Sequence, residues 1–347
     1  MSKVLYKVDK LPLFQNKVYP TYEQAITAEV GSLELVHHPV TGHIYNQLFE
    51  SERVIYDIHY DNEQSHSAAF QAHLKDVAQL IIQEMGKDNL VEVGCGKGFF
   101  LDLLLAQGCD VTGFDPSFAG DHPRIRRKYF APEDQFQANG LVLRHVLEHI
   151  LHPHQFLQML RVANGGHGLI YIEVPCLDWI ISNGTWWDIF YEHVNYFRLS
   201  DLTGMFDNVH AAGRCFGEQY LYLIADLGSL RTNFEIRHEF SSESLKCLQP
   251  IIDTAKIDPT KEVVWGAASK GVIYSLHRKR LCLPVKQIVD INPNKQGKYL
   301  PVTGLQVQSP AECLSMMPAD TVIRIMNSNY LNEIQQSTGN RFQYETI

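Results

Sequence analysis

The chain has 347 residues, of which 45% are hydrophobic and 20% are charged. This length predicts about two domains, and the composition excludes a fibrous or disordered protein. The 39 acidic residues outnumber the 30 lysines and arginines, so no extended nucleic-acid-binding surface is expected. The two densest basic runs, residues 124–128 and 277–280, are short enough to be solvated helix faces, although either could contact a diphosphate.

The N-terminal residues contain no apolar stretch of the kind that a signal peptide needs, and no apolar run reaches the length of a membrane span. The seven cysteines are scattered and never form a C-x-x-C pair. This pattern is typical of reduced thiols rather than of disulfides or a cysteine-based zinc site. We therefore expect a cytoplasmic protein with no membrane partner.

Regular elements are predicted from residue 67 onward. Residues 1–66 contain several turn signals and predict an irregular accessory segment. From Ser67, apolar residues recur every three or four positions, which predicts an amphipathic helix ending near Gly86. A strand at 89–93, a helix at 99–107 and a strand at 110–115 then form a βαβ unit.

The alternation continues with a strand at 140–143, a helix at 156–162 and a strand at 168–174. Such a series predicts a doubly wound, mostly parallel sheet. A helix at 241–255 leads to a second series: a strand at 262–265, a turn at 266–271, a helix at 272–281 and a strand at 287–290. The predicted fold is α/β, with an accessory segment at 1–66, a Rossmann-like domain at 67–240 and a smaller Rossmann-like domain at 241–347.

The sharpest motif is Glu92-Val-Gly94-Cys-Gly96-Lys-Gly98, which follows a strand and opens a helix. Glycines at these positions let backbone amides approach a ligand closely. The G-x-G-x-G spacing and the acid before the first glycine favour S-adenosylmethionine over a dinucleotide. Asp115 ends the next strand, where a carboxylate can accept both ribose hydroxyls. A tight turn without a ligand is the alternative.

A second motif, His145-x-x-Glu148-His149, has the form of an inverted zinc-peptidase motif, with two imidazoles on one face of a helix. It directly follows a strand, at the edge where α/β sheets place ligands, and Pro153 is expected to end the helix early. A loop that faces the cofactor or the substrate therefore explains it better than a metal site does. Structural histidines are a further alternative.

A third motif covers residues 186–197 and sets Glu192 and His193 among large aromatic side chains. Aromatic surroundings exclude water and would favour proton abstraction by a carboxylate or an imidazole. Because neighbouring residues cannot share one helix face, one of the two would act on the substrate while the other orients it or faces elsewhere. An aromatic core with two polar surface residues is the alternative.

These motifs together resemble the S-adenosylmethionine-dependent sugar C-methyltransferase family. The resemblance rests on six stretches: residues 60–67, 91–100, 113–117, 144–150, 190–197 and 216–221. Residues 263–271 and 289–297 resemble the C-terminal domain of the same family. Members typically carry an N-terminal zinc module, a central methyltransferase domain and a Rossmann-like domain that helps to hold a nucleotide-linked sugar. Characterised relatives methylate carbon 3 of a 4-keto deoxysugar nucleotide.

The resemblance implies roles for individual residues. His193 would be the base that forms an enolate, assisted by Glu192, with support from His149 and from a nearby tyrosine such as Tyr191. The implied cofactor contacts are Glu92, Gly94, Gly96, Gly98, Phe99, Asp115, Pro116, Arg144 and His145. The implied contacts to the nucleotide sugar are Tyr56, Tyr60, His66, Lys270, Asn292 and Lys295. A monomer or a small homo-oligomer is expected.

The chain departs from the family at several positions. His38 and Thr41 stand where zinc cysteines are expected, so no metal is expected in the N-terminal segment. Phe190 and Tyr191 stand where some relatives have Tyr-His, and Ala268 replaces a glycine of the C-terminal turn. Three other functions remain open: O- or N-methylation of another acceptor, a zinc hydrolase that uses the second motif, and nucleotide-sugar binding without turnover.

Overall fold

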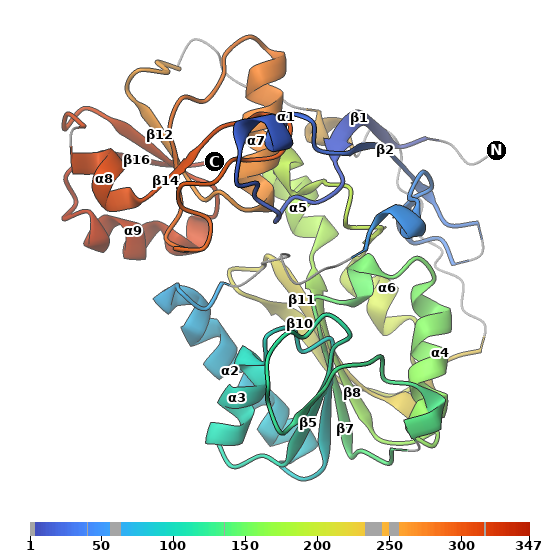
Figure 1. The fold of residues 1–347 in the computed structure, drawn as a ribbon. Coiled ribbons are helices and arrows are strands. Elements are labelled where there is room, and N and C mark those ends of the chain that lie inside the picture. Colours follow the sequence, from blue (N-terminus) through green and yellow to red (C-terminus); the bar gives the residue numbers. More distant parts are fainter. Residues whose placement is uncertain are drawn as a thin grey trace.

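A computed structural model describes residues 4–39, 41–55, 64–134, 136–232, 245–249, 257–315 and 317–347. Figure 1 shows the chain in two lobes, with the central part of the sequence in one lobe and the two ends of the sequence together in the other. Within the described ranges, no helix combines the length and the apolar character that crossing a membrane would require.

A seven-stranded sheet forms the centre of the first lobe, in the order β10-β11-β8-β7-β4-β5-β6. The five strands from β8 to β6 are parallel, and β11 runs antiparallel to both of its neighbours. The strands are β4 (Leu90–Val93), β5 (Val111–Phe114), β6 (Ile125–Arg126), β7 (Gly140–Arg144), β8 (Leu169–Pro175), β10 (Val209–Cys215) and β11 (Tyr220–Asp226). The predicted doubly wound sheet is confirmed.

Helices cover both faces of this sheet (Figure 1). Helices α2 (Ala68–Met85) and α3 (Phe99–Ala106) pack with one buried apolar cluster, and α4 (Pro153–Ala163) packs with another. The Ser67 side chain caps α2 by accepting the N–H of Phe70. Two shorter helices, α5 (Leu177–Asn183) and α6 (Leu199–Thr203), follow β8 and β9. The predicted helix from Ser67 to near Gly86 is confirmed.

The N-terminal segment is more regular than expected. Strands β1 (Tyr6–Pro12), β2 (Val30–His37) and β3 (Ile44–Asn46) form an antiparallel sheet, and α1 (Tyr22–Ile26) lies between the first two in sequence. The fourth strand of this sheet is β9 (Asn195–Tyr196), from the third sequence motif. The expectation of an irregular segment was wrong, because the partner strand that completes this sheet lies about 150 residues away in the sequence.

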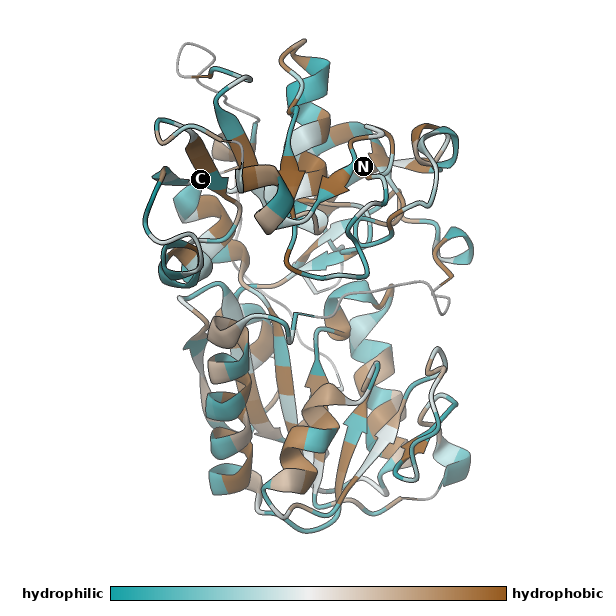
Figure 2. Ribbon diagram, turned by 60° about the vertical axis from the view of Figure 1, so that its left-hand side comes forward, coloured by the Kyte–Doolittle hydropathy of each residue, from teal (hydrophilic) through white to brown (hydrophobic). Residues whose placement is uncertain are grey.

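The C-terminal part forms a second parallel sheet, in the order β14-β13-β12-β15-β16. Its strands are β12 (Glu262–Trp265), β13 (Ile288–Val289), β14 (Val307–Gln308), β15 (Val322–Ile325) and β16 (Gln343–Thr346). Its helices are α7 (Ser269–Arg280), α8 (Pro310–Ser315) and α9 (Leu331–Ser337). Figure 2 shows hydrophobic residues concentrated in the central strands, as expected for a sheet buried on both faces. The predicted second series of strands and helices thus forms a parallel sheet of its own.

Some local expectations were wrong. Pro153 begins α4 instead of ending a helix, because proline needs no N–H donor at a first helical position. His145 lies in a loop with a positive φ of 51°, and only residues 147–149 form a 3₁₀ turn, η3 (Leu147–His149). The two imidazoles of the second motif therefore do not share a helix face.

The basic runs also differ from expectation. Residues 125 and 126 form β6, so the first run is not a helix face. In the second run, Arg278 is fully buried and pairs with Glu262 at 2.8 Å. The helix predicted at 241–255 falls mostly outside the described residues; within it, Lys246–Leu248 form a 3₁₀ turn.

Candidate active site

A cavity lies between the two lobes, where elements of both parallel sheets meet. It is lined by three side chains that follow β7, namely His145, Glu148 and His149, and by His193 from the third motif. The C-terminal unit contributes Lys270, Asn292 and Lys295. Carboxyl ends of parallel strands are where α/β sheets bind ligands, so the cavity has the position of an active site.

The glycine loop lies at the end of β4, along the same sheet edge, and its residues are not part of the cavity lining. Gly94 has a φ of 76°, and a Cβ atom there would lie 2.5 Å from a methyl carbon of Val146. Gly98 has a φ of 86° and leads directly into α3. Both positions thus need glycine. The loop is held by its own backbone: the N–H groups of Gly94 and Cys95 donate to the Phe114 carbonyl, and that of Gly98 donates to the Cys95 carbonyl. Phe99, in the first turn of α3, is partly exposed next to this loop.

Asp115 follows the adjacent strand and hydrogen-bonds to the glycine loop. Its Oδ2 accepts the N–H of Gly96 at 2.8 Å, and its Oδ1 accepts both the N–H and the hydroxyl of Ser117. Each carboxylate oxygen can accept more than one hydrogen bond, so these contacts orient Asp115 and leave it able to accept ribose hydroxyls. Pro116 follows directly and is exposed.

Glu92 lies on β4 with almost no exposure, and its Oε2 has no hydrogen-bond partner among the described residues. Burial raises the pKa of its carboxyl to about 8, although the nearby Arg144 opposes the shift. A buried carboxyl with an unsatisfied oxygen is stabilised by a ligand that brings a cation. The ammonium group of an amino-acid ligand such as S-adenosylmethionine would fit this requirement.

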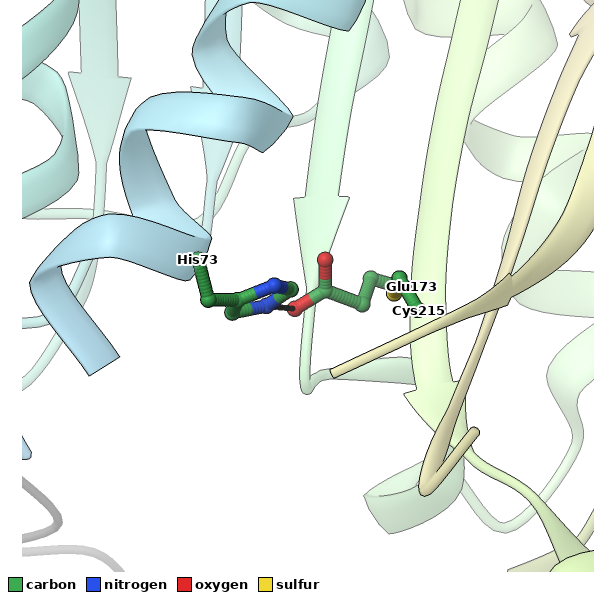
Figure 3. Close-up of side chains that lie close together, drawn as sticks. All are labelled: His73, Glu173 and Cys215. Carbon is green, nitrogen blue, oxygen red and sulfur yellow. Dashed lines mark hydrogen bonds and ion pairs between the residues drawn. The ribbon is translucent and has the colours of Figure 1, made fainter. Parts of the chain in front are cut away.

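Arg144 and His145 lie around a second buried carboxylate, Glu173 on β8. Arg144 donates to Glu173 Oε1 at 2.8 Å, and His145 Nε2 lies 3.0 Å from the same oxygen. Tyr171 donates to Oε2 at 2.6 Å, and His73 Nε2 lies 3.3 Å from Oε1 (Figure 3). Although burial would raise the pKa of Glu173, Arg144 and the histidines hold it well below its usual range. Arg144 is therefore occupied by Glu173 and packs over the Phe100 ring.

His145 connects this carboxylate to the cavity. Its Nδ1 lies 3.3 Å from Glu148 Oε1, so its two ring nitrogens face two different carboxylates. Burial disfavours the imidazolium, but the interactions with Glu148 and Glu173 raise the pKa of His145 to about 9. His145 is thus a cation at neutral pH.

His149 and His193 lie together in the cavity wall, with ring centroids 4.9 Å apart. His149 Nδ1 is 2.9 Å from the main-chain carbonyl of Glu192, which can only accept a hydrogen bond. Neither ring nitrogen of His193 has a hydrogen-bond partner among the described residues, and Phe190 packs against its ring. Burial, followed by the charges of His149 and His145, lowers the pKa of His193 well below its usual range. Neutral His193 is therefore able to accept a proton.

Glu192 and Tyr191 point away from the cavity, towards the N-terminal segment. Glu192 Oε2 accepts the N–H of Gln15 at 2.7 Å. The Tyr191 hydroxyl accepts the N–H of Glu50 at 3.0 Å, and its ring packs against Phe49. These two predicted catalytic residues thus contact the N-terminal segment, while His149 and His193 lie in the cavity.

The predicted substrate contacts differ in their surroundings. Lys270 pairs with Asp188 at 3.1 Å and donates to Gln219, whereas Lys295 is almost fully buried and has no carboxylate partner among the described residues. Asn292 is buried, and its Nδ2 has no partner in the described chain. His66 also lines the cavity. Tyr56 and Tyr60 lie outside the described residues.

Asp290 was not predicted as a site residue, although it ends a strand as Asp115 does. Its Oδ2 accepts the N–H of Ala267 at 2.8 Å and its Oδ1 accepts that of Asn292 at 2.9 Å. In each of the two parallel sheets, an acidic side chain at the end of one strand thus accepts an N–H from the turn that follows the neighbouring central strand. Glu173 and Asp188 were also missed, and Glu148 was noted only as part of the second motif. A strand-end acid could have pointed to Asp290, but no local signal distinguishes Glu173 or Asp188.

Two groups of three potential metal ligands occur among the described residues. One is His73, Glu173 and Cys215, drawn in Figure 3, and the other is Glu148, His149 and His193. In the first, Glu173 is already neutralised by Arg144 and His145, which disfavours a further cation. The zinc-peptidase set His145, Glu148 and His149 is not assembled, because both nitrogens of His145 face carboxylates.

The region that corresponds to the zinc module contains a hydrogen-bonded histidine cluster. The Thr41 hydroxyl lies 2.9 Å from His38 Nδ1 and 2.6 Å from His43 Nδ1, and His43 Nε2 lies 2.9 Å from Asn195 Oδ1. Asn195 in turn donates to the carbonyls of residues 147 and 150. The cluster therefore connects the N-terminal sheet to the turn that carries His149.

Comparison with known proteins finds a matching family for the central part of the chain. Residues 66–211 match a family described as a methyltransferase domain. The C-methyltransferase NovU of Streptomyces niveus is 28% identical over 166 residues, which cover 43% of this chain and 40% of NovU. The chain thus spans about two fifths of the length of that curated relative.

Solved structures give weaker similarities. One is the 1,6-didemethyltoxoflavin-N1-methyltransferase of Burkholderia thailandensis with bound S-adenosylhomocysteine, at 13% identity and a TM-score of 0.35, covering 55% of this chain and 97% of that one. Another is magnesium protoporphyrin IX methyltransferase of Synechocystis, at 14% identity and a TM-score of 0.36, covering 49% and 90%. Similarities at this level do not establish a shared substrate. The family match, together with the glycine loop and the strand-end Asp115, identifies residues 66–211 as an S-adenosylmethionine-dependent methyltransferase domain.

Proposed function

We propose that the chain is a C-methyltransferase that methylates the carbon next to the ketone of a nucleotide-linked sugar. The observation that carries this proposal is the position of His193. It is a buried, neutral imidazole without a hydrogen-bond partner in the described chain, and it lines the same cavity as Lys270 and Lys295 of the C-terminal unit. A carbon acid needs such a base, whereas O- or N-methylation needs it less. The name of NovU, a C-methyltransferase, supports the same assignment.

The cofactor would be held by residues at the ends of β4 and β5. Glu92 would pair with its ammonium group, and Asp115 would accept its ribose hydroxyls. When bound, S-adenosylmethionine supplies an electrophilic methyl group on a sulfonium. Arg144 is already paired with Glu173, so its role would be to shape the site through that carboxylate instead of contacting the cofactor directly.

His193 would remove the acidic proton from the carbon next to the ketone. The C–H bond breaks, the proton moves to a ring nitrogen of His193, and the electron pair delocalises onto the ketone oxygen as an enolate. The enolate carbon would then form the new C–C bond to the methyl group, while the methyl–sulfur bond breaks and its electron pair stays on the sulfur, which leaves as a neutral thioether. His149 already donates its Nδ1 proton to a carbonyl, so its neutral form has an acceptor at Nε2 and cannot donate to the enolate.

Tyr220 is the better candidate for the enolate donor. It lines the cavity, and its ring packs edge to face on His145 at 4.5 Å. Burial raises the pKa of its hydroxyl well above the usual range, so it keeps its proton for a hydrogen bond. A donor at the developing oxyanion typically contributes a large part of the rate enhancement.

The nucleotide would bind to the C-terminal unit. Asp290 ends β13 as Asp115 ends β5, so a ribose could be recognised in the same way at both places. Lys295 and Asn292 supply donors for a diphosphate, and Lys295 has no competing carboxylate among the described residues. Lys270, in contrast, is neutralised by Asp188.

Calorimetric titration with S-adenosylmethionine and S-adenosylhomocysteine tests the cofactor. Wild-type protein should bind both, and Asp115→Ala should bind them at least about tenfold more weakly because two hydrogen bonds are lost. Asp110→Ala is a matched control, since Asp110 precedes the same strand at its opposite end and pairs with Arg124. Absence of binding by folded wild-type protein would refute the proposal.

The acceptor is tested separately. Protein that binds the cofactor product is incubated with keto-sugar nucleotides in deuterated water, and deuterium incorporation next to the ketone is followed by NMR or mass spectrometry. Exchange that requires His193 supports a carbon acceptor. Methylation of an oxygen or nitrogen without such exchange would favour the other acceptors.

A further inference from the structure

We propose that Glu148 is a positioning residue for the proton-accepting histidines: its carboxylate provides the counter-charge for the imidazolium that forms when His193 takes a proton. The inference rests on the proposed function, because it concerns the base of that same site. Glu148 has no role in the family resemblance, and the sequence singled it out only as part of a metal motif.

The geometry places one carboxylate oxygen of Glu148 close to both histidines. That oxygen, one ring nitrogen of His149 and one ring nitrogen of His193 all lie within 4.8 Å of one another. Glu148 is 1% exposed and lines the cavity, and its Oε2 has no hydrogen-bond partner among the described residues. A buried carboxylate oxygen without a donor is costly, so a donor that appears during the reaction would be strongly stabilised.

One carboxylate oxygen of Glu148 is already occupied. Glu148 Oε1 faces His145 Nδ1 at 3.3 Å, and His145 Nε2 faces Glu173, which Arg144 pairs in turn. These four side chains alternate in charge, from Glu148 through the His145 cation and Glu173 to Arg144. The charges of these four side chains sum to zero when His149 and His193 are both neutral. Glu148 is therefore held in place before His193 takes up a proton.

Other charged groups around the pair are farther away or already neutralised. Asp188 lines the same cavity but pairs with Lys270 at 3.1 Å. The Glu192 carboxylate contacts Gln15, and only its main-chain carbonyl faces His149. Tyr196 lies 6.3 Å from the His193 ring, and its hydroxyl donates to the Phe190 carbonyl. Glu148 is thus the carboxylate that brings an oxygen within 4.8 Å of both imidazoles in the described chain.

Proton transfer would use this arrangement as follows. The substrate C–H bond breaks and its proton forms an N–H bond on His193, which becomes a cation. The Glu148 carboxylate would stabilise that cation, directly or through His149, in the way that a buried carboxylate orients and supports a catalytic histidine. No oxidant or further reactant is needed.

The test is an NMR titration of imidazole resonances in isotope-labelled protein with EDTA present and no substrate. Single His149→Gln and His193→Gln variants assign the two residues. Glu148→Gln, which removes the charge but keeps the shape, should lower the pKa of the pair by about one unit, a tenfold loss of proton affinity. Asp178→Asn, a change in a half-exposed carboxylate that pairs with Arg214 and does not line the cavity, should leave the titration unchanged.

A second variant has the opposite sign. His145→Gln removes the neighbouring cation and should raise the pKa of the same histidines, which also covers the case in which Glu148→Gln does not fold. Unchanged titration of both histidines in either folded variant would overturn the proposal. Stoichiometric zinc binding that needs Glu148, His149 and His193 would also overturn it, since these groups would then be ligands. This titration uses neither acceptor nor cofactor. A failure of the proposed methyltransferase activity would therefore appear in the cofactor-binding and deuterium-exchange experiments and not in this titration.

Discussion

His149 donates its Nδ1 proton to the main-chain carbonyl of Glu192, 2.9 Å away. The neighbouring His193 lies in the cavity, while the Glu192 carboxylate binds the Gln15 N–H in the opposite direction. The dipeptide Glu192-His193 therefore supplies the proposed base, a main-chain acceptor for His149, and a contact to the N-terminal segment. Replacing the two side chains should thus have different consequences.

His193→Gln should lower the methylation rate by about 10²- to 10⁴-fold, the contribution typical of a general base, with unchanged cofactor affinity. Glu192→Gln should instead lower the free energy of unfolding by about 1–3 kcal/mol, because a buried charge-assisted hydrogen bond is weakened. Chemical denaturation and steady-state rates measure both effects. A Glu192→Gln protein of wild-type stability that has lost all proton abstraction would show that Glu192 acts on the substrate.

Glu92 should release a proton when S-adenosylmethionine binds. Its pKa is raised to about 8 in the folded protein, so its carboxyl is mostly protonated at pH 7, and an ammonium partner would favour ionisation. Calorimetry at pH 7 in buffers of different ionisation enthalpy should detect release of about one proton. Cofactor affinity should therefore rise with pH until about pH 8.

Two variants test whether Glu92 is the source of that proton. Glu92→Gln should bind more weakly and release none, whereas Asp115→Ala should bind more weakly but still release it. Equal proton release by wild type and Glu92→Gln would contradict the assignment of Glu92 to the ammonium group.

Lys295 should contribute to nucleotide binding and Lys298 should not. Lys295 is buried in the cavity wall, while Lys298 is exposed three residues later. Lys295→Met should weaken binding of a nucleoside diphosphate about ten- to a hundredfold, as expected for one charge-assisted hydrogen bond, and should reduce its salt dependence. Lys298→Met is the matched control. Equal effects of the two changes in fluorescence or calorimetric titrations would argue against a diphosphate at Lys295.

His43 should make the protein less stable in acid. Burial, followed by nearby cationic groups, lowers its pKa to about 3 in the folded state, while an unfolded histidine titrates near its ordinary value. Below about pH 6.5 the unfolded state therefore binds more protons, so stability present above that pH is lost on acidification, by up to about 1.4 kcal/mol per pH unit from this group.

Urea unfolding at pH 7, 6 and 5 measures this slope. His43→Gln should reduce the slope, and His210→Gln, a change in an exposed histidine on β10, should keep it. A wild-type slope in His43→Gln would mean that other groups account for the acid sensitivity.

The fold was largely predictable because its signals are local. Apolar periodicity predicted α2, and glycine turns between short apolar runs predicted the βαβ units of both parallel sheets. The N-terminal sheet was missed because its fourth strand, β9, is only two residues long and lies in another part of the chain. A two-residue strand has no period that a sequence can reveal.

The sequence by itself determined the order of elements and the glycine loop with Asp115, because these depend on residue type and spacing. Only the tertiary structure decided which groups surround the histidines of the site. Glu192 meets Gln15 across 177 positions, and His145 meets Glu173 from the adjacent strand. Such contacts determine which carboxylates are neutralised and which imidazoles stay neutral. They arise from packing between distant segments, which sets burial and charge pairing but leaves no local pattern in the chain.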